Sequence, residues 1–142
     1  MFNMDILKDL RDSFDELNVE NLKFIEINSE DVEGIFSYIG KNEVRSIEEF
    51  YALNVKKLCS YSGNADAKED FFESLLDGDF EASSVANAID SLSDWSIDLR
   101  LLISKVEEIS PEAKTYVVED KGGYSEFLFE DKERFCFVGV SI

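Results

Sequence analysis

The segment that follows Pro111 constrains the fold most strongly, because it contains three runs of residues that favour β-strands. These runs are KTYVVED, YSEFLFE and RFCFVGVSI, and each is rich in aromatic and β-branched residues. The segments DKGG and EDKE lie between them and are typical of tight turns. The sequence therefore predicts a three-stranded antiparallel meander in the C-terminal part of the chain.

The N-terminal part of the chain shows the apolar spacing of helices. The stretch MDILKDLRDSFDELN carries apolar residues at three- and four-residue steps, which predicts a first amphipathic helix. The stretch SIEEFYALNVKKLCSY opens with Ser46 and Glu49 at the capping-box spacing, in which each side chain satisfies a free backbone amide of the other. A second helix is therefore expected over residues 46–61.

Two more helices are expected in the central part of the chain. Asp66 and Glu69 indicate the start of one helix, and Gly78 indicates its end. A longer helix is expected over residues 84–109, because its apolar residues keep to one face. Trp95 lies on that apolar face, so we expect it in the core rather than in a binding surface.

The segment between the first two helices is expected to hold one strand and one short helix. LKFIEIN alternates along its length and predicts a strand that joins the sheet. SEDVEGIFSYIG is expected to form a short helix that Gly40 closes. The predicted class is α+β, with N-terminal and central helices packed on a small antiparallel sheet. With 142 residues the chain fits a single domain, 1–142.

The chain carries a formal net charge of −18, from 32 acidic and 14 basic residues. The charge does not indicate disorder, because 44% of the residues are apolar and can fill a core. Phosphates repel such a chain, which argues against nucleic acid and anionic membranes as partners. A basic protein is the expected partner, because opposite fields speed encounter and fix orientation.

No pattern in the sequence indicates catalysis. The chain has no histidine, which removes the usual general base and the commonest metal ligand. It carries no nucleotide-binding or nucleophile motif, and an EF-hand register starting at Asp77 fails because Ala82 and Ala88 replace the glycine and glutamate. We therefore expect no catalytic residue, no metal and no cofactor. Cys59 and Cys136 are far apart in sequence and are expected to be reduced thiols of a cytoplasmic protein.

Negative charge is concentrated between residues 66 and 98, where ten acidic residues accompany one basic residue. Carboxylates three or four residues apart share a helix face, and like charges there destabilise a helix by about 0.2–0.5 kcal/mol per pair. A surface kept at that cost indicates a binding function. The predicted partner-binding residues are Asp66, Glu69, Asp70, Glu73, Asp77, Asp79, Phe80, Glu81, Asp90, Asp94 and Asp98.

Two alternatives remain open for these residues. The acidic rows also fit an ordinary solvated face on an acidic protein. Phe80 lies between Asp79 and Glu81, and it is either an exposed anchor surrounded by carboxylates or a core residue.

The size, the acidity, the absence of histidine and the α+β pattern together resemble a bacterial toxin-immunity protein, in particular one from a contact-dependent growth inhibition system. The resemblance covers the whole chain at the level of class and carries over no individual residue. It implies a non-enzymatic inhibitor that binds the basic C-terminal nuclease domain of a cognate toxin. A nucleic-acid mimic of the anti-restriction or anti-CRISPR type and a small carboxylate-based, metal-dependent enzyme are the alternatives.

Overall fold

A computed structural model describes residues 3–28, 32–61, 80–95, 97–121 and 123–141. Within these ranges, six strands form one antiparallel sheet in the order β1-β2-β6-β5-β4-β3. The elements in chain order are α1 (Met4–Leu10), η1 (Arg11–Glu16, a 3-10 helix), β1 (Lys23–Asn28), β2 (Glu33–Gly40), η2 (Lys41–Glu43), α2 (Ile47–Tyr61), β3 (Glu81–Ser83), α4 (Val85–Ser93), α5 (Arg100–Glu107), β4 (Lys114–Lys121), β5 (Tyr124–Glu130) and β6 (Arg134–Ser141). The chain has the α+β architecture that its sequence predicts.

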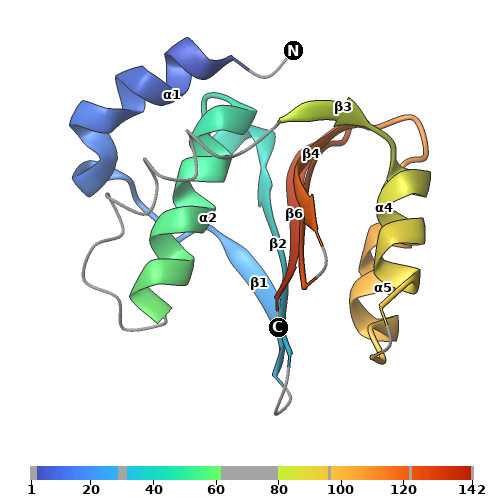
Figure 1. Cartoon of the computed structure of the whole chain (residues 1–142). Helices are drawn as coiled ribbons and strands as arrows, with labels where there is room; N and C mark the ends of the chain where they lie inside the picture. The colour runs from blue at the N-terminus through green and yellow to red at the C-terminus, as the bar shows by residue number, and fades with distance from the viewer. Residues whose placement is uncertain (1–2, 29–31, 62–79, 96, 122, 142) are drawn as a thin grey trace.

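Helices cover both faces of the sheet (Figure 1). We call the side under α1 and α2 the first face and the side under α4 and α5 the second face. Each face has its own apolar cluster: Leu53 of α2 and Phe137 of β6 belong to the first, whereas Leu102 of α5 and Val138 of β6 belong to the second. Because consecutive strand residues point to opposite faces, a strand in the middle of this sheet is apolar on both sides.

The short helix expected over residues 29–40 is wrong, because Glu33–Gly40 form strand β2. This strand lies between β1 and β6, so its side chains are buried on both faces. Ile35 and Ile39 pack into the first cluster, and Phe36 packs into the second. A two-sided strand is a continuous apolar run without alternation, and such a run does not distinguish a strand from a buried helix.

A single long helix over residues 84–109 is also wrong, because two helices, α4 and α5, occupy this part of the chain. One helix of that length would extend about 39 Å, whereas an eight-residue strand extends about 27 Å. The break between α4 and α5 keeps both helices over the second face. Trp95 lies at the break, half-buried against the second cluster, and its Nε1 donates to Ser125 Oγ of β5 at 3.3 Å.

Other expected elements are present with small changes. The first expected helix is α1 followed by the 3-10 helix η1, and the helix from Ser46 is α2, where the backbone N–H of Glu49 donates to Ser46 Oγ at 3.2 Å. LKFIEIN supplies β1. The three C-terminal strands pair consecutively, but β6 also pairs with β2, so they are part of a larger sheet than expected. The helix expected from Asp66 lies outside the described residues.

The close approach of α5 to β2 depends on Gly34. An added Cβ at this position would lie 2.7 Å from Cδ1 of the buried Leu102 and 2.9 Å from Cγ1 of Ile27. We expect Gly34→Ala to lower the free energy of unfolding by about 1 kcal/mol or somewhat more, because overpacking forces neighbouring side chains to shift. Urea denaturation measures this change.

Gly40→Ala is the matched control. An added Cβ there meets only Glu43 Oε2, at 3.6 Å, and the backbone φ of −66° suits any residue. Its free energy of unfolding is expected to stay within about 0.5 kcal/mol of the wild-type value. Equal stabilities of the two variants would contradict the tight packing of α5 on β2.

Candidate functional site

The described residues include part of the predicted acidic surface. Glu81, Asp90, Asp94 and Asp98 are exposed, and Phe80 is buried. The remaining predicted residues lie outside the described residues: Asp66, Glu69, Asp70, Glu73, Asp77 and Asp79.

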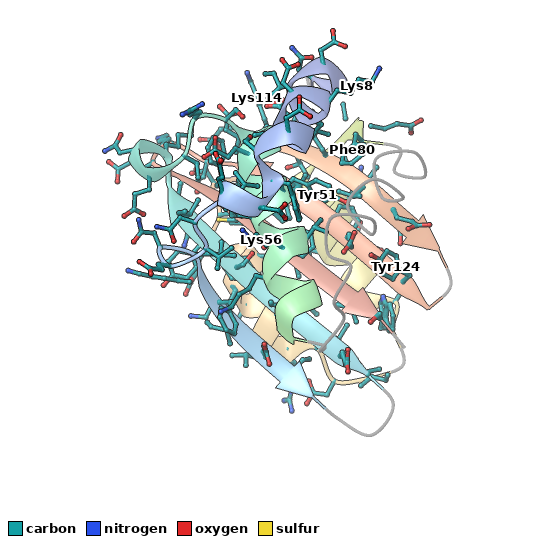
Figure 2. All side chains as sticks on the ribbon, turned by 90° about the vertical axis from the view of Figure 1, so that its left-hand side faces the viewer. Lys8, Tyr51, Lys56, Phe80, Lys114 and Tyr124 are labelled. Carbon is teal, nitrogen blue, oxygen red and sulfur yellow. The ribbon has the colours of Figure 1, made fainter. Side chains whose placement is uncertain are left out.

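Phe80 belongs to the core, which is the second of the two interpretations left open by the sequence. Its exposed fraction is 9%, and its ring meets the Tyr51 ring of α2 edge-on, at a centroid distance of 5.2 Å and an angle of 87° (Figure 2). Its backbone φ of 47° is rare for a residue with a side chain. The buried ring thus fixes the point where the chain enters β3, next to the exposed Glu81.

Asp90, Asp94 and Asp98 do not form the continuous helical row that the sequence indicates. Asp90 lies on α4, Asp94 caps the C-terminal end of α4, and Asp98 lies beyond the helix. Asp98 also has a cationic partner, because Arg100 Nη2 lies 2.7 Å from Asp98 Oδ2. The side-chain hydrogen bond from Arg100 lowers the pKa of the Asp98 carboxyl to about 2. Of these three carboxylates, Asp90 and Asp94 are therefore the two that form no ion pair with a described residue.

A second group of exposed carboxylates lies on the N-terminal helices, where the sequence analysis placed no site. Asp5 and Asp9 are four residues apart in α1, and Asp12 and Asp15 are three residues apart in the 3-10 helix η1. Each spacing matches the period of its own helix, so each pair shares one face. All four side chains are exposed. The signal was visible in the sequence at the same spacing, but Lys8 and Arg11 lie among these acids, whereas one base accompanies the ten acids of residues 66–98.

Lys56 of α2 fixes the position of η1. Its Nζ donates to the backbone oxygens of Phe14 at 3.2 Å, Asp15 at 2.8 Å and Leu17 at 2.8 Å. Figure 2 shows Lys56 on α2, below η1. A cation at the C-terminal end of a helix also favours the helix dipole. The Asp12 and Asp15 carboxylates are thus presented from a helix end that α2 holds in place.

Most acidic side chains in the described residues form no ion pair with another described residue. Within the described part of the chain, the ion pairs are Lys41–Glu130, Arg100–Asp98 and Lys105–Glu108. The exposed carboxylates of α1, η1, β3 and α4 take part in none of these pairs. A cationic partner can therefore approach them without displacing an internal ion pair.

Glu126 is an acidic group that the sequence gave no reason to single out and that the fold buries almost completely, as it also buries Glu48 of α2. Glu126 lies on β5 with 9% of its surface exposed, directly opposite Glu119 of β4 and Gly139 of β6. Burial raises the pKa of the Glu126 carboxyl to about 7, the hydrogen bond from Tyr124 lowers it, and the Glu119 carboxylate raises it. Burial also raises the pKa of Tyr124. The flanking apolar residues of YSEFLFE concealed this position.

Two further classes of site were tested on the described residues. No group of three or more Cys, Asp or Glu side chains among them is arranged to hold a metal ion. In the same ranges, each helix is too short or too polar to cross a membrane. The exposed carboxylates and Glu126 thus remain the candidate functional residues in the described part of the chain.

Comparison with known proteins adds nothing to this geometry. No family model, no curated protein and no solved structure matches the chain.

Glu126 makes stability depend on pH in a defined direction. Because its folded pKa of about 7 exceeds the ordinary value of 4.5, the folded state binds this proton more tightly than the unfolded state. The resulting stability is fully present below about pH 4.5 and is lost as the pH rises through about 7. At pH 8 we expect Glu126→Gln to have a higher free energy of unfolding than the wild type, by up to about 3 kcal/mol. Urea denaturation measures the difference.

The free energies of unfolding of the wild type and Glu126→Gln are compared across pH. Their difference isolates Glu126 from the other carboxylates. It should shrink steadily from pH 8 to pH 5, because Glu126 is protonated at the acidic end. Glu112→Gln removes an exposed carboxylate and should leave the wild-type profile unchanged. Parallel wild-type and Glu126→Gln profiles would show that Glu126 titrates normally.

Proposed function

We propose that this protein is an inhibitory binding protein of the immunity type, which neutralises a basic toxin domain of the nuclease class through its acidic surface. The observation that supports the proposal is the set of exposed carboxylates on β3 and α4 that have no ion-pair partner among the described residues: Glu81, Asp90 and Asp94. The formal net charge of −18 extends the same preference to the whole molecule.

The physical basis is electrostatic complementarity. A nuclease cleft holds phosphates with cationic side chains, and the exposed carboxylates present anions to the same groups. Long-range attraction raises the rate of encounter, and close pairs fix the orientation of the complex. Inhibition then needs no chemistry from this chain, which agrees with a sequence that contains no histidine.

A nucleic-acid mimic is the second candidate, and one observation favours it. Exposed carboxylates occur on η1 beside the first face and on α4 beside the second face, so negative charge is not confined to one side of the sheet. Such a distribution suits an inhibitor that occupies the DNA-binding channel of an enzyme. The identity of the retained partner distinguishes the two candidates, because the first requires a toxin nuclease domain and the mimic requires another DNA-binding enzyme.

The partner is sought by retaining proteins from the source lysate on the tagged chain and eluting them in steps of salt. One basic protein that stays bound at equal stoichiometry above 0.5 M salt is expected, because the Debye length there is about 4 Å and surface charge alone is screened. Many basic proteins released together at low salt would identify a nonspecific polyanion and contradict the proposal.

The acidic surface is tested with a triple charge reversal, Glu81→Lys/Asp90→Lys/Asp94→Lys. We expect the dissociation constant of the retained complex to rise at least about tenfold, or about 1.4 kcal/mol. Calorimetry at low salt measures it. The matched control, Glu107→Lys/Glu112→Lys/Glu133→Lys, changes the net charge equally at exposed positions elsewhere. Equal losses in both variants would indicate attraction by net charge and not by this surface.

A further inference from the structure

The two edges of the sheet differ in how well they are protected. An edge strand presents unpaired backbone N–H and C=O groups, and proteins limit such edges by short strands, bulges, proline or lysine. Strand β3 is three residues long. Strand β1 is six residues long, contains no proline, pairs with β2 in an unbroken register and has its one lysine, Lys23, at its first position. Among the described elements, no strand pairs with the outer edge of β1.

The side chains of β1 leave room for another strand. Ile25 lies opposite Phe36 on the second face, and Ile27 lies opposite Gly34 on the same face. Both isoleucines are half-buried, and Ile27 packs against the second cluster. A neighbouring strand would cover the apolar surface that they expose.

Two oppositely charged side chains lie on the first face at β1: Glu26 of β1 itself and Lys57 of α2. Phe24 lies opposite Ser37, and Lys57 Nζ of α2 lies 4.9 Å from the centroid of the Phe24 ring. Glu26 lies two residues further along the same face, opposite Ile35. Neither Glu26 nor Lys57 takes part in an ion pair within the described ranges.

We propose that the outer edge of β1 is a self-association surface, on which two copies of the chain pair antiparallel about a two-fold axis at Ile25. The two sheets then continue through the interface. Ile25 faces its own copy, and Phe24 with its overlying Lys57 faces Glu26 of the second copy. Directly opposed residues lie about 4.5–5.5 Å apart, which brings each Lys57 ammonium within reach of a Glu26 carboxylate.

The charges select this register over its neighbours. Directly opposed residues of antiparallel strands point to the same face, so alternative registers differ by two residues. A shift that centres the axis on Glu26 places two carboxylates against each other. A shift that centres it on Phe24 brings the two Lys57 ammonium groups together. Only the axis at Ile25 pairs unlike charges, and like charges directly opposed destabilise a sheet.

The association is weak and depends on salt. Pairing of one short strand buries less surface than the roughly 1,200 Å² typical of a stable complex. Each copy also carries a net charge of −18, so the copies repel at low salt. The exposed acids on β3 and α4 lie toward the other edge of the sheet, away from the axis. This surface is thus distinct from the one in the proposed inhibitory function and independent of it.

Sedimentation of the purified chain over a range of concentrations, at 0.1 M and 0.5 M salt, measures the association. We expect a monomer–dimer equilibrium that is stronger at 0.5 M salt, where long-range repulsion is screened. Glu26→Lys and Lys57→Glu should each weaken dimerisation at least about tenfold, because each creates two like-charge contacts. An equimolar mixture of the two variants should restore a heterodimer, because all contacts then pair unlike charges.

Cysteine cross-linking tests the register. In a Cys59→Ser background, Ile25→Cys should form a disulfide-linked dimer under mild oxidation, since facing residues lie within the 4.4–6.8 Å that a disulfide spans. Ile27→Cys is the control, because its two copies would lie roughly 13–14 Å apart. Cys136 does not interfere, because it is buried and burial raises the pKa of its thiol to about 12.

Several results would overturn the proposal. A wild-type chain that stays monomeric at millimolar concentration at both salts would remove the dimer. Cross-linking through position 27 in preference to 25 would show a different register. Failure of the variant mixture to restore the dimer would show that Glu26 and Lys57 do not meet. A dimer that Ile25→Lys leaves intact would place the interface elsewhere, because a lysine in the middle of an edge strand blocks pairing.

Discussion

The coverage of both sheet faces by helices is the constraint on which the rest of this structure depends. Strands β2 and β6 have to be apolar on both sides, and residues such as Phe36 and Phe137 fill the two clusters from neighbouring strands. A polar group can enter these strands only with a partner. Ser37 is fully buried and donates to Asn54 Oδ1 of α2, while Asn54 Nδ2 donates to the backbone oxygen of Phe50 at 2.9 Å. This pair fixes α2 over β2.

The same constraint explains which parts of the fold were predictable from the sequence. Strand β1 lies at an edge and α2 begins with a cap, so periodicity and capping chemistry identified both. Strand β2 has no alternation, because neither of its faces meets water, and its pattern matched a short helix equally well. The division between α4 and α5 depends on the length of the strands beneath them, which no local pattern in the sequence reports. The short helix expected over residues 29–40 and the single helix expected over 84–109 were both wrong because tertiary packing overrides the local pattern there.

The candidate site was predictable to a smaller degree. Exposure at Glu81, Asp90 and Asp94 follows from charge, but the pairing of Asp98 with Arg100 followed from the end of α4 and not from helical spacing. The prediction used only the concentration of acids in residues 66–98, so it omitted the acidic pairs of α1 and η1. Glu126 was hidden for the opposite reason, because a carboxyl among aromatic strand residues looks like the polar side of a strand until the fold shows that it is buried.

The position of β6 in the sheet has a consequence for the synthesis of the protein. Of the described strands, β6 leaves the ribosome last, yet it lies between β2 and β5 and joins the N-terminal hairpin to the C-terminal one. Until it emerges, two half-sheets have open apolar edges and neither cluster is closed. We therefore expect the nascent chain to be prone to aggregation during translation. Its pairing of distant segments also slows folding, so the excess of negative charge keeps growing chains apart during the interval when they are most exposed.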